Sequence, residues 1–135
     1  MIPGAQNDGR PRKIILVVDD DEAMRLALYG MLSVRYQVIL AIDGVDGAEK
    51  AAILPPPNLV IADISMPRLD GVGMVHRIRE IAGMREVPII FISGQDLVGN
   101  LLAGMSDSPF SVQYVGKTAD PAILAKKVRR ALCEA

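Results

Sequence analysis

The chain has 135 residues, of which 50% are hydrophobic and only 4% aromatic, and its formal net charge is −1. This length fits one domain with a core built mainly from aliphatic side chains and methionine. A charge so close to zero offers no field that attracts nucleic acid or an anionic membrane, so we expect no direct nucleic-acid binding. No apolar run approaches the roughly 20 residues that cross a bilayer, so we expect no membrane insertion.

The N-terminal segment and the cysteine content set the outline of the domain. Residues 1–12 hold several Gly, Pro and polar residues without an apolar run, so we interpret them as a flexible tail before one domain over residues 13–135. The single cysteine, Cys133, allows no internal disulfide and suits a reducing cytosol, which predicts a cytoplasmic protein. We expect this thiol to be structural and half-exposed.

Five short, mostly apolar segments are predicted to be β-strands. Their Val, Ile and Leu residues are typical of strands that are buried on both faces, as in a parallel sheet. Each segment is followed directly by Asp, Ser or Gly. The expected strands cover residues 13–18, 36–42, 59–62, 89–92 and 112–115.

The segments between these strands carry helical signals. Asp21 is a plausible N-cap for the first helix, and Asp120 followed by Pro121 is typical of the start of the last one. Gly99 and Asn100 lower the helix propensity of the fourth segment, which we predict to be a weak helix. The expected helices cover residues 22–33, 45–53, 72–83, 96–103 and 121–133, with approximate ends.

Strands that alternate with helices predict a three-layer α/β fold, in which a doubly wound parallel sheet of five strands carries about five helices. Ligands of such sheets bind just outside the carboxyl ends of the strands. Polar residues occupy those positions in this chain: Asp19 and Asp20, Asp63, Ser93 and Lys117. If the strands are neighbours, these side chains face one cleft.

Three carboxylates in one cleft require protonation or a cation. At a separation of about 5 Å and an effective dielectric constant near 20, each pair repels by roughly 3 kcal/mol. Oxygen ligands with room for water suit Mg²⁺ or Mn²⁺. With such a cation beside Asp63, and with Ser93 and Lys117 opposite, a phosphoryl group in transfer could be stabilised. Asp63 is then the nucleophile and forms an aspartyl phosphate.

This pattern resembles the response-regulator receiver domain (CheY-like) of two-component signalling. The resemblance runs from residue 13 to the C-terminus. It rests on the Asp19-Asp20 pair after ILVV, on Asp63 before ISMPRLDG, on Ser93 after IIFI and on Lys117 after YVG. It implies a flavodoxin-like sheet with strand order 2-1-3-4-5.

The resemblance also implies a role for each acidic residue. Asp63 accepts phosphate from a histidine kinase or a histidine phosphotransfer protein, and an unidentified downstream protein reads the result. Asp20, Asp63 and the backbone carbonyl of Ser65 ligate Mg²⁺ (or Mn²⁺), and Asp19 acts through a metal-bound water. The domain is regulatory and not a classical enzyme, although it assists its own phosphotransfer and dephosphorylation.

The remaining implied residues form the switch. Ser93 is the switch hydroxyl, Lys117 contacts the phosphoryl group, and Tyr114 is either the aromatic switch residue or a plain strand residue. The family usually has a proline after the lysine, joined by a cis peptide, but here Thr118 follows. A cis bond before a residue other than proline costs about 2.5–4 kcal/mol, so we expect a trans peptide.

Two other functions remain open. Thr118, which stands where the family usually has proline, and the weak fourth helix favour a receiver-like interaction module that phosphorylation does not regulate. A metal-dependent phosphatase of the haloacid-dehalogenase type would also use Asp63 as nucleophile, but it usually carries a second Asp two residues on, where this chain has Ser65. His76, a lone histidine, is interpreted as a solvated helix residue, and the methionines are interpreted as packing residues.

Overall fold

The structure, a computed structural model, describes residues 11–53, 55–93, 112–116 and 120–134. Most of the predicted N-terminal tail and the predicted helix over residues 96–103 therefore lie outside the described residues. The observed elements, in chain order, are β1 (Ile14–Val18), α1 (Glu22–Leu32), β2 (Gln37–Ala41), α2 (Gly44–Ala51), β3 (Leu59–Asp63), α3 (Gly71–Arg79), β4 (Ile89–Ser93), β5 (Val112–Gly116) and α5 (Pro121–Ala131).

The five strands form one sheet in the order β2-β1-β3-β4-β5, and every neighbouring pair is parallel. This confirms the predicted doubly wound sheet with order 2-1-3-4-5. Val18 of β1 pairs with Ala62 of β3, and Asp63 pairs with Ile92 of β4. The carboxyl ends of the central strands therefore meet at one edge, on either side of the point where the strand order reverses.

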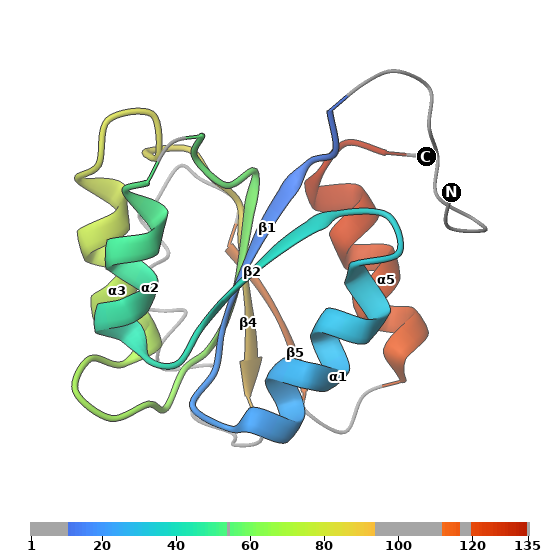
Figure 1. Ribbon diagram of the computed structural model, residues 1–135, viewed down its shortest axis with the longest axis horizontal. Coiled ribbons are helices and arrows are strands. Elements are labelled where there is room, and N and C mark those ends of the chain that lie inside the picture. Colours follow the sequence, from blue (N-terminus) through green and yellow to red (C-terminus); the bar gives the residue numbers. More distant parts are fainter. Residues whose placement is uncertain (1–10, 54, 94–111, 117–119, 135) are drawn as a thin grey trace.

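Helices cover both faces of the sheet, with α2 and α3 on one face and α1 and α5 on the other (Figure 1). Side chains of a strand alternate between the two faces, so each central strand contributes to two cores. In β1, Leu16 and Val18 pack into the core under α2 and α3, whereas Ile15 and Val17 pack into the core under α1 and α5. All five residues of β1 and of β3 are buried, which explains the uninterrupted apolar runs in the sequence.

Each described helix begins at an aspartate. The Asp21 carboxylate accepts a hydrogen bond from the backbone N–H of Ala23 at 3.0 Å, which confirms the predicted cap. The other three caps are Asp43, Asp70 and Asp120. No helix in the described ranges has both the length and the apolarity that a bilayer crossing requires.

Three predicted helices end at least two residues early. The helix expected over residues 121–133 ends at Ala131. The helix expected over residues 45–53 ends at Ala51, and the helix expected over residues 72–83 ends at Arg79. At the ends of α2 and α3 the backbone N–H groups turn to carbonyls three residues back, which tightens and closes the helix. Gly83 then adopts φ +84°, a left-handed conformation that no right-handed helix includes.

Candidate functional site

Three carboxylates converge at the carboxyl edge of the sheet. Asp19 and Asp20 directly follow β1, and Asp63 is the last residue of β3. One carboxylate oxygen from each residue lies within 4.8 Å of the others. The pairing of β1 with β3 produces this arrangement, because it aligns the ends of the two strands. Asp19 and Asp63 are buried, with exposed fractions of 1% and 5%, whereas Asp20 is exposed at the mouth of the cluster.

The loop that carries Asp19 is held on several sides. The backbone N–H of Asp19 donates to the carbonyl of Ala41 at 3.1 Å, and one carboxylate oxygen of Asp19 accepts from the N–H of Asp21 at 2.9 Å. The guanidinium of Arg25 in α1 donates to the Asp19 carbonyl at 2.7 Å. The loop between β1 and α1 is therefore fixed by β2 and α1 as well as by its own turn.

The segment after Asp63, residues 64–70, is called the β3–α3 loop below. The backbone N–H of Ser65 donates to the Asp63 carboxylate at 3.3 Å. Beyond the loop, the first residue of α3 lies directly against the strand end. A Cβ at Gly71 would be 2.5 Å from the Asp63 carbonyl oxygen and 2.9 Å from the Phe91 ring. The helix can approach Asp63 this closely only because Gly71 has no side chain.

The donor set of this cluster fits a hard divalent cation. At separations of no more than 4.8 Å and an effective dielectric constant near 20, each pair of ionised carboxylates repels by at least about 3 kcal/mol. A cation offsets this repulsion, and carboxylate oxygens with space for water are what Mg²⁺ and Mn²⁺ prefer. Exposure of Asp20 provides that space, since water reaches the cluster from its side. Asp19, Asp20 and Asp63 could therefore hold such an ion.

The other predicted site residues are placed only in part. Ser93 is the last residue of β4 and pairs with Gly116 of β5, so it lies at the same edge of the sheet as Asp63. Tyr114 lies in β5, opposite Phe91. The side chains of Ser93 and Tyr114 are not described, and Lys117 and Thr118 lie outside the described residues. Their roles, and the trans peptide after the lysine, stay predictions.

An ion pair that sequence reasoning missed lies beside the β3–α3 loop. Arg68 Nε is 3.2 Å from a carboxylate oxygen of Asp43, the cap of α2, which is only 4% exposed. Asp43 directly follows the predicted strand over residues 36–42, but no local pattern links it to a residue so far along the chain. As predicted, His76 is exposed, and Met74 and Met84 are fully buried packing residues. Met105, another methionine predicted to pack, lies outside the described residues. Cys133 is exposed and not half-exposed as predicted, because it follows the last turn of α5.

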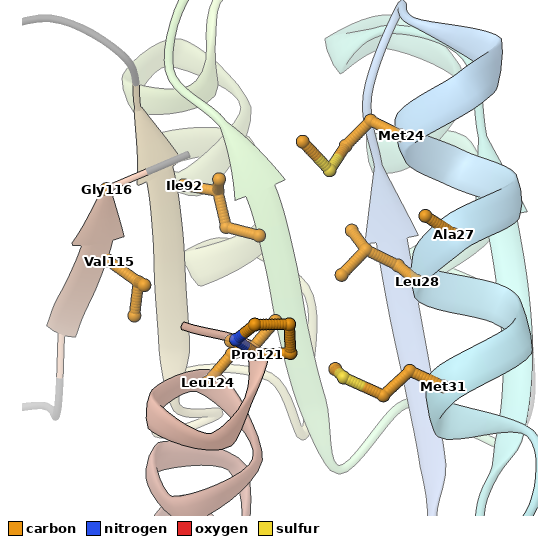
Figure 2. Close-up of a pocket in the computed structure, with 9 residues that line it drawn as sticks. All are labelled: Met24, Ala27, Leu28, Met31, Ile92, Val115, Gly116, Pro121 and Leu124. Atoms are coloured by element: carbon orange, nitrogen blue, oxygen red, sulfur yellow. The ribbon is translucent and has the colours of Figure 1, made fainter. Parts of the chain in front are cut away.

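An apolar pocket of about 270 Å³ lies between α1 and α5, beneath the ends of β4 and β5 (Figure 2). The side chains of Met24, Leu28 and Met31 in α1 point across it toward β4, β5 and α5. The pocket is lined by Met24, Ala27, Leu28, Met31, Ile92, Val115, Gly116, Pro121 and Leu124. None of these side chains carries a charge or a strong hydrogen-bonding group, so the lining cannot orient a polar ligand.

Comparison with known proteins connects this geometry to one family. The family model of the response regulator receiver domain matches residues 15–129. The response regulator MprA of Mycobacterium ulcerans is 41% identical over 67% of the chain and 38% of its own length. The probable transcriptional regulator ycf27 of Cyanophora paradoxa is 34% identical over 90% of the chain and 48% of its length. The hybrid signal transduction histidine kinase D of Dictyostelium discoideum is 28% identical over 96% of the chain and 9% of its length. The chain thus spans less than half the length of these relatives.

Solved structures show the same fold. A receiver domain protein of Clostridium thermocellum superposes with a TM-score of 0.79 at 21% identity, over 90% of this chain and 94% of that one. The chemotaxis protein CheY4 of Vibrio cholerae superposes with a TM-score of 0.78 at 22% identity, over 90% and 99%. At these identities the similarity establishes the architecture and no individual role.

Proposed function

Because this chain belongs to the family of response regulator receiver domains, we propose that it is a phosphoacceptor that takes a phosphoryl group on Asp63. The donor is the phosphohistidine of a histidine kinase or of a histidine phosphotransfer protein. The observation that carries this proposal is the convergence of three carboxylates within 4.8 Å, with Asp63 at the end of a central strand. A cytoplasmic location belongs to the same proposal.

The proposed reaction is a displacement at phosphorus. A carboxylate oxygen of Asp63 forms a bond to phosphorus while the bond from phosphorus to the donor's imidazole nitrogen breaks, and that nitrogen leaves with the electron pair. The Ser65 N–H limits rotation of the attacking carboxylate by its hydrogen bond at 3.3 Å. Ser93 and Lys117 are proposed to contact the oxygens of the transferred group.

The same proposal assigns the cation ligands. Asp20, Asp63 and the backbone carbonyl of Ser65 would ligate Mg²⁺ or Mn²⁺ directly, and Asp19 would act through a bound water. When bound, the ion supplies positive charge near the phosphoryl oxygens, where negative charge must be stabilised. The burial of Asp19 and Asp63 supports this assignment, because two desolvated like charges need an opposite charge beside them.

The proposed output is a change in protein contacts. Phosphorylation adds negative charge at the sheet edge, which would draw Ser93 inward and bias Tyr114 and the β5 surface toward a second conformer. A downstream protein would bind one of the two conformers. The printed names of the relatives, a response regulator and a hybrid histidine kinase, support a place in a phosphorelay.

The test is labelling with a small phosphodonor. The protein is incubated with acetyl phosphate in Mg²⁺ or in EDTA, and intact mass spectrometry measures the gain of one phosphate. We expect a Mg²⁺-dependent adduct that Asp63→Asn abolishes. Asp70→Asn is the matched control, since it removes an exposed carboxylate of the same segment while asparagine still caps α3. A wild-type protein that binds Mg²⁺ but gains no phosphate would instead favour the interaction module that phosphorylation does not regulate.

A further inference from the structure

Asp43 is a buried carboxylate outside the acidic cluster. Among the described residues three aspartates are buried, and the other two, Asp19 and Asp63, belong to that cluster. Both carboxylate oxygens of Asp43 are engaged. Oδ1 accepts from the backbone N–H of Asp46 at 2.8 Å and so caps α2, while Oδ2 lies 3.2 Å from Nε of Arg68. The cap needs only one oxygen, so the second is available to bind the β3–α3 loop.

The loop is in a conformation that needs external support. Arg68 has φ +68°, in the left-handed region that a residue with a side chain rarely adopts. The neighbouring Leu69 N–H donates to the carbonyl of Pro67 at 2.7 Å, which closes a tight turn. The Leu69 carbonyl packs so closely on Gly44 that a Cβ there would collide with it. Arg68 and Leu69 of the loop therefore contact Asp43 and Gly44 at the start of α2.

The inner side of the same loop lies on Asp63. Ser65 donates its N–H to the Asp63 carboxylate, and Gly71 packs on the Asp63 backbone. We propose that Asp43 and Arg68 are positioning residues for Asp63: their ion pair holds the β3–α3 loop in the conformation that presents the Ser65 backbone to the phosphoacceptor. This inference rests on the proposed function, because it describes how the same site is kept in a reactive geometry.

The variants separate this role from simple stability. Asp43→Asn keeps the size of the side chain and the cap of α2, since asparagine caps as well as aspartate, but it removes the charge. Arg68→Asn removes the guanidinium, and asparagine tolerates positive φ better than most residues. The control is Lys50→Gln, which breaks an ion pair of the same length, 3.2 Å to Asp46, on the same helix but away from the loop.

Two quantities are measured for each variant at a temperature where it is folded: the rate of acetyl phosphate labelling at saturating Mg²⁺, and Mn²⁺ affinity by electron paramagnetic resonance without a phosphodonor. We expect Asp43→Asn and Arg68→Asn each to slow labelling by about ten-fold, because small displacements of reacting groups cost this much or more. Mn²⁺ affinity should fall severalfold. The double variant should be no slower than either single one, since both break the same pair. Lys50→Gln should stay within about two-fold of the wild type.

The outcomes distinguish this inference from the proposed function. If the wild type is labelled and Arg68→Asn matches it in both rate and Mn²⁺ affinity, the positioning role is wrong while the phosphoacceptor stands. Arg68 is 59% exposed in its side chain, so this variant should fold even if Asp43→Asn does not. If the wild type is never labelled, the proposed function fails and the positioning role fails with it. Recovery of most of the rate by Arg68→Lys supports the ion pair as the cause.

Discussion

Substitution of Gly71 by alanine tests how closely α3 packs against the proposed phosphoacceptor. The added Cβ would be 2.5 Å from the Asp63 carbonyl oxygen, 2.9 Å from Phe91 and 3.0 Å from the Cα of Ile64. Two of these three atoms belong to the backbone and cannot rotate away. The loss of unfolding free energy from overpacking should therefore be at the upper end of its usual range, about 3 kcal/mol. Alanine also raises the unfolding free energy by about 1 kcal/mol, because it has lower entropy in the unfolded chain and higher helix propensity than glycine. The expected net loss is about 2 kcal/mol of unfolding free energy.

Urea denaturation of Gly71→Ala measures this loss directly, with Gly30→Ala as the control. Gly30 lies in α1, and a Cβ there would meet no atom within 4 Å, so alanine should raise the unfolding free energy by about 0.5–1 kcal/mol. Because the strain falls on Asp63, Gly71→Ala should also slow acetyl phosphate labelling, whereas Gly30→Ala should not. A Gly71→Ala protein as stable as the wild type would refute the proposed tight contact.

Three further expectations concern stability and the cation. Burial, together with the hydrogen bond from its hydroxyl to Glu134 at 2.7 Å, raises the pKa of Tyr36 to about 12, above the ordinary value of 10.0. The resulting stabilisation is complete below pH 10 and is lost as the pH rises through about 12. In chemical denaturation, Tyr36→Phe should abolish this pH dependence and lower the unfolding free energy at pH 7 by about 1 kcal/mol. Met74 is fully buried, so Met74→Ala should lower the unfolding free energy by about 2–4 kcal/mol, and a loss under 1 kcal/mol would contradict its place in the core. Asp20→Asn should raise the melting temperature in EDTA, because it removes repulsion from Asp63, but should reduce the increase that Mg²⁺ produces; an unchanged Mg²⁺ response would exclude Asp20 as a ligand.

Local patterns in the sequence were sufficient to predict the sheet. The apolar runs of β1 and β3 predicted strands buried on both faces because every residue of these strands is buried, and all but Ile14 and Asp63 pack into one of the two cores. Asp21 and Asp120 predicted helix starts because the interaction that makes a cap spans only two residues. The convergence of the carboxylates at one edge then followed from the parallel topology.

Other features depend on contacts between distant segments, which a single sequence does not display. The pairing of Asp43 with Arg68 requires the β3–α3 loop to pack on the start of α2, and neither residue stands in a pattern that indicates this. The end of α3 at Arg79 was missed for a similar reason. Its guanidinium donates to the carbonyls of Met84 and Val87 in the following turn, so the tertiary structure holds a turn where helix propensity alone would allow another turn of helix.

The most direct measurement of the central claim is chemical trapping of the phosphoryl group at its position in the chain. After incubation with acetyl phosphate and Mg²⁺, borohydride reduces an aspartyl phosphate to homoserine, and peptide mass spectrometry locates the converted residue. We expect conversion at position 63 in Mg²⁺, none in EDTA, and none in Asp63→Asn. Conversion at another residue, or none in a wild-type protein shown to bind Mg²⁺, would contradict the assignment of Asp63 as the phosphoacceptor.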